Sequence, residues 1–324
     1  MAKFTGTNAA DNINGTKGAD QIFGLGGNDN LVGLDGDDVI EGGAGGDGIF
    51  GSVGFDYASY RSSPVGVYVS LTDLIGHYGH AEGDQLYGIE GVIGSKYRDL
   101  MTGGEQGDVF YGEGGADHLG GLDGNDKLYG GGGNDLLEGG FGDDDLYGGA
   151  GNDTASLYNY GSGVVADLAS RTATGTTTGH DRLFEIENLV GTPYADRLAG
   201  DGRANVLNGS FDSDLLTGRG GADRFDYNQT SDSPSTSPDH ITDFSRSQGD
   251  RIDLRDVDGN QRIDGVQDLT FIGKAAFTAV GQLHFYQSGG HTYIEANTSD
   301  TTPGAELVIV LDQSIAMKAG DFLL

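Results

Sequence analysis

Apolar residues recur at every ninth position through three stretches of the chain, and glycine and polar residues fill most of the positions between them. The apolar positions are Ile13, Ile22, Leu31, Ile40, Ile49, Ala58, Met101, Phe110, Leu119, Leu128, Leu137, Leu146, Ala155, Leu198, Leu207, Leu216 and Phe225. Nine is not a helical period, and each glycine inside a helix would cost about 1 kcal/mol relative to alanine. The pattern therefore predicts short strands, each centred on an inward-pointing apolar side chain and joined to the next by a tight turn.

An aspartate stands two positions before each of these apolar residues, with Asn205 as the exception. The aspartates are Asp11, Asp20, Asp29, Asp38, Asp47, Asp56, Asp99, Asp108, Asp117, Asp126, Asp135, Asp144, Asp153, Asp196, Asp214 and Asp223. The repeated unit reads Gly-Gly-x-Gly-x-Asp-x-U-x, where U is apolar. Glycine adopts positive φ and can turn backbone carbonyls inward, and carboxylate and carbonyl oxygens are the ligands that Ca²⁺ accepts. The turns therefore predict calcium sites.

This nonapeptide resembles the calcium-binding repeat of RTX proteins, which implies an all-β fold, a parallel β-roll solenoid. In that family two nonapeptides form one coil, and Ca²⁺ lies between turns n and n+2. If each such pair holds one ion, about eleven ions bind. The expected side-chain ligands are the sixteen aspartates, and units 6–14 and 200–208, which depart from the pattern, are expected to be weak sites.

The main chain of the turns is expected to complete the coordination of calcium. The expected turn glycines are Gly26, Gly36, Gly45, Gly115, Gly124, Gly133, Gly142 and Gly151. Asn or Asp at position five is expected to shape the turn, because both residues tolerate the left-handed conformation. These residues are Asn28, Asp37, Asn125, Asn134, Asp143 and Asn152.

Composition supports a cation as the partner of this chain. Asp and Glu number 50 against 18 Lys and Arg, so the formal net charge is −32, and 61 residues are glycine. Such a composition is typical of disorder, but 36% of the residues are apolar, so we expect an ion to neutralise the acid and let a core form. The charge argues against nucleic acid or an anionic membrane as a partner. The chain has no cysteine, and no apolar run is long enough to span a bilayer.

A longer period of 97 residues divides the chain into blocks. Shifting the sequence by 97 places Asp84, Ile89 and Glu90 on Asp181, Ile186 and Glu187. The predicted segments are nonapeptide blocks at 1–56, 94–153 and 191–226, inserts without calcium at 57–93 and 154–190, and a β-rich C-terminal cap at 227–324. Alternating runs such as VGVYVSL read as strands. We expect the inserts to form additional coils that are stabilised by core packing.

The C-terminal segment resembles that of serralysin-type proteases and of the R-modules of mannuronan C5-epimerases. The similar pieces are ADRF, ITDF, GDRIDL, FIG and the terminal Asp-Phe-Leu-Leu. The resemblance implies a cap that carries the signal for a bacterial type I exporter, and hence a secreted, extracellular protein. The N-terminus has no apolar region typical of a Sec-type signal peptide, which agrees with export by a type I exporter. The initial Met and the terminal Asp-Phe-Leu-Leu lead us to expect a complete chain.

The sequence predicts no catalytic residues, and we expect a protein that is not an enzyme. No HExxH motif occurs. His77 and His80 in HYGHAEGD are interpreted as a solvated loop rather than a zinc site, since no third ligand is evident. The loop at 256–264 resembles an EF-hand loop but has Gln261 where glycine is needed, so a polar loop is preferred. The tyrosines of the first insert are interpreted as strand packing rather than a sugar platform.

Three functions remain open from the sequence. The first is a structural or adhesive protein that contacts a cell surface or an acidic extracellular polysaccharide. The second is a stand-alone auxiliary module of a polysaccharide-modifying enzyme, as the resemblance to R-modules implies. The third is an enzyme with an unrecognised site.

Overall fold

Successive nonapeptides alternate between two mainly parallel β-sheets in the computed structural model, which describes residues 1–176, 179–299 and 304–324. Ile22 pairs with Ile40 in one sheet and Leu31 with Ile49 in the other, so partners lie 18 residues apart and two nonapeptides make one coil. All four side chains are fully buried between the sheets. The predicted all-β solenoid with calcium-type turns is confirmed.

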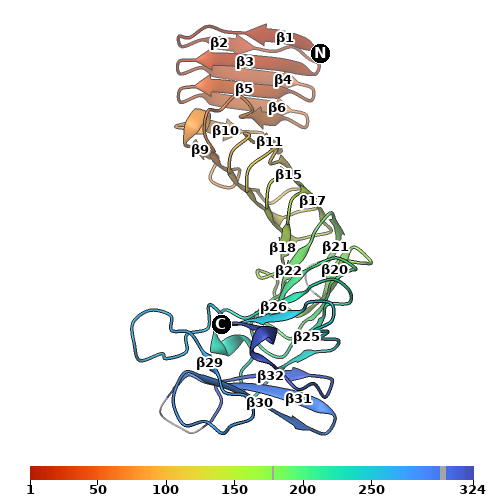
Figure 1. Ribbon diagram of the computed structural model, residues 1–324. Helices are drawn as coiled ribbons and strands as arrows, with labels where there is room; N and C mark the ends of the chain where they lie inside the picture. The colour runs from red at the N-terminus through yellow and green to blue at the C-terminus, as the bar shows by residue number, and fades with distance from the viewer. Residues whose placement is uncertain (177–178, 300–303) are drawn as a thin grey trace. The chain divides into compact units, whose positions relative to one another are not determined.

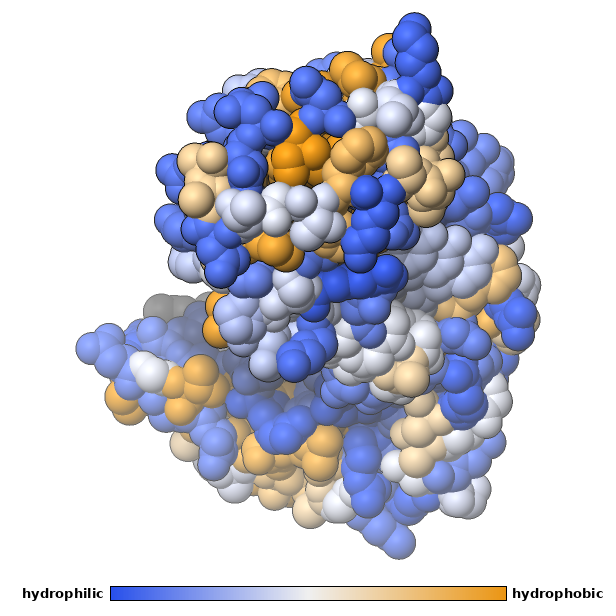
Figure 2. Space-filling model, turned by 90° about the horizontal axis from the view of Figure 1, so that it is seen from above, coloured by the Kyte–Doolittle hydropathy of each residue, from blue (hydrophilic) through white to orange (hydrophobic). Residues whose placement is uncertain are grey.

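The chain divides into two compact units, residues 1–155 with 179–186 and residues 156–178 with 187–324. This division differs from the six segments expected from the sequence, which stay a prediction. Figure 1 shows β1 to β6 of the first unit stacked as successive rungs. Figure 2 looks onto this end and shows apolar residues ringed by hydrophilic ones, in agreement with the half-buried Phe4 and Ile13 of the first coil.

The strands of the first unit pair into two sheets. One consists, in pairing order, of β1 (Ala2–Thr5), β3 (Asp20–Gly26), β5 (Val39–Ala44), β7 (Tyr57–Ser59), β11 (Gly91–Ile93), β13 (Val109–Tyr111), β15 (Lys127–Gly132), β17 (Asp145–Ala150) and β21 (Gly179–Phe184). The other consists of β2 (Asn12–Asn14), β4 (Asn30–Asp35), β6 (Gly48–Val53), β10 (Gln85–Tyr87), β9 (Ile75–His77), β8 (Tyr68–Ser70), β12 (Leu100–Thr102), β14 (His118–Asp123), β16 (Leu136–Phe141) and β18 (Thr154–Ser156).

The second unit repeats this arrangement and ends in an antiparallel meander. Its larger sheet consists of β20 (Thr172–Gly175), β19 (Val164–Asp167), β23 (Arg197–Ala199), β25 (Leu215–Thr217), β27 (Asp239–Ile241), β32 (Leu307–Leu311), β31 (His291–Asn297), β30 (Gln282–Ser288) and β29 (Thr270–Phe271). Its smaller sheet consists of β22 (Asn188–Val190), β24 (Val206–Asn208), β26 (Arg224–Asp226), β28 (Arg251–Asp253) and β33 (Phe322–Leu323). The predicted β-rich C-terminal cap thus extends both sheets.

The inserts add coils to the roll, and each also contains an antiparallel hairpin that the sequence analysis did not predict. In the first insert β10 and β11 pair in parallel with block strands, whereas β8 and β9 form an antiparallel hairpin. The second insert repeats the hairpin with β19 and β20. Leu74 and Arg171 sit at equivalent points of the two hairpins with a φ of 61°. Because neither residue is glycine, the sequence carried no signal for these turns.

Helical structure in the described residues is limited to three short 3₁₀ segments. These are η1 (Gly79–Ala81), η2 (Thr230–Asp232) and η3 (Ala319–Asp321). None of the described helices has the length and apolar character needed to cross a membrane.

Candidate calcium sites

The aspartates at position six of the repeat form ladders of hydrogen bonds along the edges of the roll. Where a repeat follows two units later in the same block, the backbone N–H of the earlier aspartate donates to Oδ1 of the aspartate 18 residues on, as in Asp20 to Asp38 at 2.7 Å and Asp117 to Asp135 at 2.8 Å. Apart from Asp11, which is half-buried, these carboxylates are almost completely buried. The ladder therefore uses Oδ1 of the later aspartate in each pair, and the contacts of Oδ2 depend on the local turn.

Two kinds of turn differ in what Oδ2 contacts. In eleven turns Oδ2 is buried and accepts no hydrogen bond within the described part of the chain. These open turns contain Asp29, Asp38, Asp47, Asp56, Asp117, Asp126, Asp135, Asp144, Asp153, Asp214 and Asp223. In each of them the residue at position two has a positive φ, between 68° for Glu113 and 104° for Gly140.

In the other six turns, the closed turns, the backbone N–H of position two donates to the side chain of position six. Thr16 donates to Asp20 Oδ2 and Gly104 to Asp108 Oδ2, each at 2.6 Å, and Asp201 donates to Asn205 Oδ1 at 2.8 Å. The closed turns contain Asp11, Asp20, Asp99, Asp108, Asp196 and Asn205. A closed turn satisfies its own carboxylate or amide oxygen and does not require a cation there.

The order of the two kinds is regular. The closed turns are the first two turns of each nonapeptide block, and every open turn follows another turn 18 residues earlier. The number of open turns therefore equals the number of n and n+2 pairs from which about eleven ions were expected. In the repeats, an orphaned oxygen occurs only where a preceding turn supplies the other half of a site.

The space between paired turns is lined by main-chain oxygens as well as by this carboxylate. In the pair of turns that contain Asp117 and Asp135, the Gly115 carbonyl oxygen lies only 1.2 Å from where a Cβ on Gly133 would stand. In the opposite direction, the Gly130 oxygen lies 2.5 Å from where a Cβ on Gly112 would stand. The earlier turn thus directs a carbonyl forward, and the later turn directs a carbonyl backward.

This donor set fits calcium. Among the described residues, no three acidic or histidine side chains converge on one point, so an ion must take most of its ligands from carbonyls. Carbonyl and carboxylate oxygens are the hard donors that Ca²⁺ accepts, six to eight at a time. Between each pair of turns the ion would be held by Oδ2 of the later aspartate and by carbonyls of both turns, and it would supply positive charge to a buried anion.

Electrostatics also favours a cation at these positions. Burial raises the pKa of Asp117 and of Asp126 to about 8, and that of Asp214 to about 9. Neighbouring carboxylates contribute to these raised pKa values, as Asp99 and Asp135 do for Asp117. A divalent cation favours the ionised form and reverses both effects. Calcium therefore converts an unfavourable row of buried acids into ligands.

A comparison with known families decides the assignment. The family described as the RTX calcium-binding nonapeptide repeat (4 copies) matches residues 5–33, 24–58, 92–119, 120–155 and 189–232, which together make up half of the chain. The chain belongs to this RTX family. A comparison with curated proteins finds no match. The protein is a calcium-binding β-roll that binds Ca²⁺ at multiple sites, and its inserts and C-terminal cap lie largely outside the matched ranges.

The RTX turns place some of the expected ligands differently from the sequence prediction. Asp11, Asp20, Asp99, Asp108 and Asp196 belong to closed turns, where Oδ2 accepts a hydrogen bond, so their turns can offer an ion mainly carbonyls. Seven of the eight expected glycines occupy position four with φ between 114° and 155°. Gly26 instead ends β3 at position three, and Gly27, with a φ of 104°, is the equivalent residue.

The residues at position five have a role other than the one expected. None of them has a positive φ. Instead the side-chain oxygens of Asn28, Asp37, Asn125 and Asn134 accept a backbone N–H from the turn two units later, as Asn125 does from Asp143 at 3.0 Å, and Asp143 accepts the N–H of His180 at 2.8 Å. These bonds form an outer ladder beside the aspartate ladder. Position five therefore ties successive turns together and does not shape its own turn.

Five acidic residues outside the seventeen repeats continue the aspartate ladder, and the sequence analysis did not name them as site residues. Asp84 accepts from the Asp47 N–H at 2.8 Å, and Asp181 accepts from the Asp144 N–H at 3.1 Å. The remaining three are Glu90, Asp239 and Asp250. The equivalence of Asp84 and Asp181 under the 97-residue shift was a signal that could have identified them.

The two doubtful metal motifs show no convergent ligands within the described ranges. The His77 ring stacks on Tyr68, and His80 Nδ1 lies 3.2 Å from Ser62 Oγ. In the loop at 256–264, Asp258 Oδ1 accepts the backbone N–H groups of Asn260 and Gln267. His77 ends strand β9 and His80 lies in η1, so the first motif is not the solvated loop that the sequence led us to expect, and whether either motif binds a metal stays a prediction.

The difference between open and closed turns predicts unequal effects of two identical substitutions. Asp135→Asn should remove one calcium ion per chain, or weaken that site at least about tenfold, because an amide replaces the only anionic oxygen that faces the space. Asp108→Asn should leave the ion count unchanged, since Asn205 stands at the equivalent closed turn of the next block. Equilibrium gel filtration with elemental analysis measures the ions per chain. Equal loss from both variants would contradict the assignment of open and closed turns.

Proposed function

We propose that this RTX protein is exported in an unfolded state and folds on calcium outside the cell, where it serves as a structural or adhesive protein that contacts a surface or a polysaccharide. The observation that carries the proposal is the row of buried aspartate Oδ2 atoms that accept no hydrogen bond from the described residues, as at Asp117 and Asp135. A fold that contains them needs calcium, and millimolar calcium is typical of the sites that extracellular modules use.

The C-terminal segment supports export by a type I exporter. It resembles the cap and export segment of serralysin-type proteases, and its last residues are part of the fold. Arg246 holds the Asp321 carboxylate through two hydrogen bonds, and Phe322 is buried in β33. An export signal at this end would be exposed only before folding, which agrees with folding after export.

A non-catalytic role is part of this proposal. The buried carboxylates lie one coil apart in stacks and do not converge at one point within the described residues. The calcium sites account for most of them. The proposal therefore assigns no reaction to the chain and bases its role on surface contacts.

Export can be tested by co-expressing the full chain with a bacterial type I exporter. We expect the protein in the culture medium only when the exporter is present, and we expect retention in the cell when Asp321 to Leu324 are replaced by serine and glycine. Immunoblots of medium and cells, with a cytoplasmic enzyme as a lysis marker, measure the distribution. Release without the exporter, or retention of the unaltered chain with it, would contradict the proposal.

A further inference from the structure

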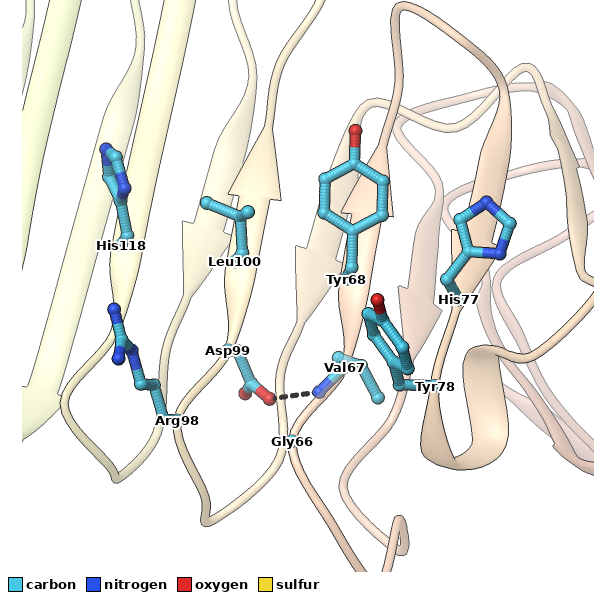
Figure 3. Close-up of a pocket in the computed structure, with 9 residues that line it drawn as sticks. All are labelled: Gly66, Val67, Tyr68, His77, Tyr78, Arg98, Asp99, Leu100 and His118. Carbon is cyan, nitrogen blue, oxygen red and sulfur yellow. Dashed lines mark hydrogen bonds between the residues drawn. The ribbon is translucent and has the colours of Figure 1, made fainter.

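A hollow of about 520 Å³ lies on the outer face of one sheet of the first unit, where the first insert meets the second calcium block. Figure 3 shows its lining: Tyr68, His77 and Tyr78 on one side, Leu100 in the middle, and Arg98 and His118 on the other side. The Tyr68 and His77 rings are stacked with centroids 5.9 Å apart. The hollow therefore combines an aromatic wall with a wall that carries the Arg98 guanidinium and the His118 ring.

Strand register sets this combination. Tyr68 pairs directly with His77 in β9 and with Leu100 in β12, and Leu100 pairs with His118 in β14. Side chains at paired positions point to the same face of a sheet, so the four form a continuous row. Tyr78 has a φ of 66°, and its N–H donates to Glu82 Oε2 at 2.9 Å. This tyrosine is 66% exposed, so its ring is available to a ligand.

The charges in the hollow favour an anion. The Arg98 side chain makes no ion pair or hydrogen bond with any described residue, although its charge interacts at longer range with the Asp117 carboxylate. The nearby Asp99 carboxylate is buried and accepts hydrogen bonds from the Val67 and Ser95 N–H groups, so it does not compete for Arg98. His118 Nε2 lies 3.6 Å from Glu138. In a chain with a formal charge of −32, such an arginine beside an aromatic wall is unusual.

The second copy of the 97-residue unit shows that the fold does not need these side chains. Its strands have the same register, with Val165 paired to Thr174 and to Arg197, and Arg197 paired to Leu215. The residues equivalent to Tyr68, His77, Tyr78, Arg98 and His118 are Val165, Thr174, Gly175, Ala195 and Leu215. The coil therefore does not require these five side chains, although the second copy has Arg197 where the first copy has Leu100.

We infer that this hollow binds a carboxylated saccharide, such as a short uronic-acid oligomer. A sugar ring offers a flat C–H face to the Tyr68 and Tyr78 rings, and its carboxylate suits the planar fork of Arg98. An open, solvent-facing aromatic wall suits a hydroxyl-rich ligand better than an apolar one. Eleven bound calcium ions would reduce the formal charge to about −10, which weakens repulsion of such an anion. This inference rests on the proposed surface role and names its ligand class.

The test is isothermal titration of the calcium-loaded full chain with trigalacturonate, with maltotriose as the neutral probe. Trigalacturonate should bind saturably and maltotriose more weakly. Arg98→Ala should weaken trigalacturonate binding about tenfold to a hundredfold and leave maltotriose binding unchanged. Tyr68→Val should weaken both. Each substitution introduces the residue of the second copy, so folding should persist. The matched control is Arg197→Ala, which removes an arginine from the equivalent face of the second copy.

Two outcomes would overturn the inference: no saturable binding of trigalacturonate to the unaltered chain, or equal binding by the Arg98→Ala and Arg197→Ala variants. Circular dichroism of the same samples separates these failures from failure of the proposed function. A chain that folds on calcium and is exported, but does not bind trigalacturonate, retains the proposed function and loses the ligand. If Arg98→Ala were to misfold, Arg98→Lys, which keeps the charge and loses the bidentate fork, should still reduce binding.

Discussion

Removal of calcium with EGTA is expected to abolish most of the β-sheet circular dichroism of this RTX protein. The buried aspartate Oδ2 atoms of the open turns would then lie beside main-chain carbonyls without a cation or a hydrogen-bond donor. Because burial already raises the pKa of Asp126 to about 8 and that of Asp214 to about 9, ionisation of these groups at neutral pH opposes the fold. Unfolding exposes the carboxylates to water and removes this penalty.

The measurement is far-ultraviolet circular dichroism during a calcium titration from EGTA. Signal should return cooperatively at millimolar or lower calcium, because each ion bridges two turns and each turn takes part in up to two sites. Magnesium is the control, since it demands octahedral geometry at shorter distances and loses its water reluctantly. A chain that keeps its β-sheet signal in EGTA would show that core packing and the two inserts carry the fold without calcium.

The repeat made most of this fold predictable from sequence. The period of nine, with an apolar residue always two places after position six, predicted short strands with inward apolar side chains, and Ile22, Leu31 and Ile40 are all fully buried. The pairing of residues 18 apart followed from the family resemblance. The hairpins of the inserts were not predictable, because their turns depend on positive φ at Leu74 and Arg171, residues that seldom adopt it.

The kind of turn was harder to predict than the strands. Position two does not decide it, since Ser52 stands in an open turn and Ser95 in a closed one. Likewise, Gly131 stands at position two of an open turn and Gly104 at position two of a closed turn. A turn is open when another turn stands 18 residues before it in the stack. This depends on the place of the nonapeptide in its block and not on the residue at position two.

One sequence signal for open turns did exist at position four. Glycine stands there in ten of the eleven open turns, and Asp212, with a φ of 73°, stands in the other. Among closed turns only Gly18 has glycine at this position. Position four of an open turn needs positive φ and also space for the carbonyl of the turn before it, and glycine meets both needs.

The same geometry predicts a large effect from one methyl group at Gly133. Gly133→Ala should lower the free energy of unfolding of the calcium-loaded protein by about 4 kcal/mol or more, in the exceptional range for a single substitution. A φ of 139° is strained for alanine, and its Cβ would stand 1.2 Å from the Gly115 carbonyl oxygen. To relieve this clash the main chain of the two turns must shift. The same main chain supplies carbonyl oxygens to a calcium site, so calcium affinity should fall together with stability.

The neighbouring Gly132 gives the matched control for this prediction. A Cβ there would lie 3.9 Å from the Glu113 oxygen, φ is not positive, and Ala150 already stands at the equivalent position of the turn 18 residues later. Gly132→Ala should therefore unfold close to the unaltered protein in urea at saturating calcium, while Gly133→Ala unfolds at much lower urea. If the two variants unfolded together, position four would not be the point where turns meet around the ion. A large difference would show that one carbonyl contact between turns governs both folding and calcium binding.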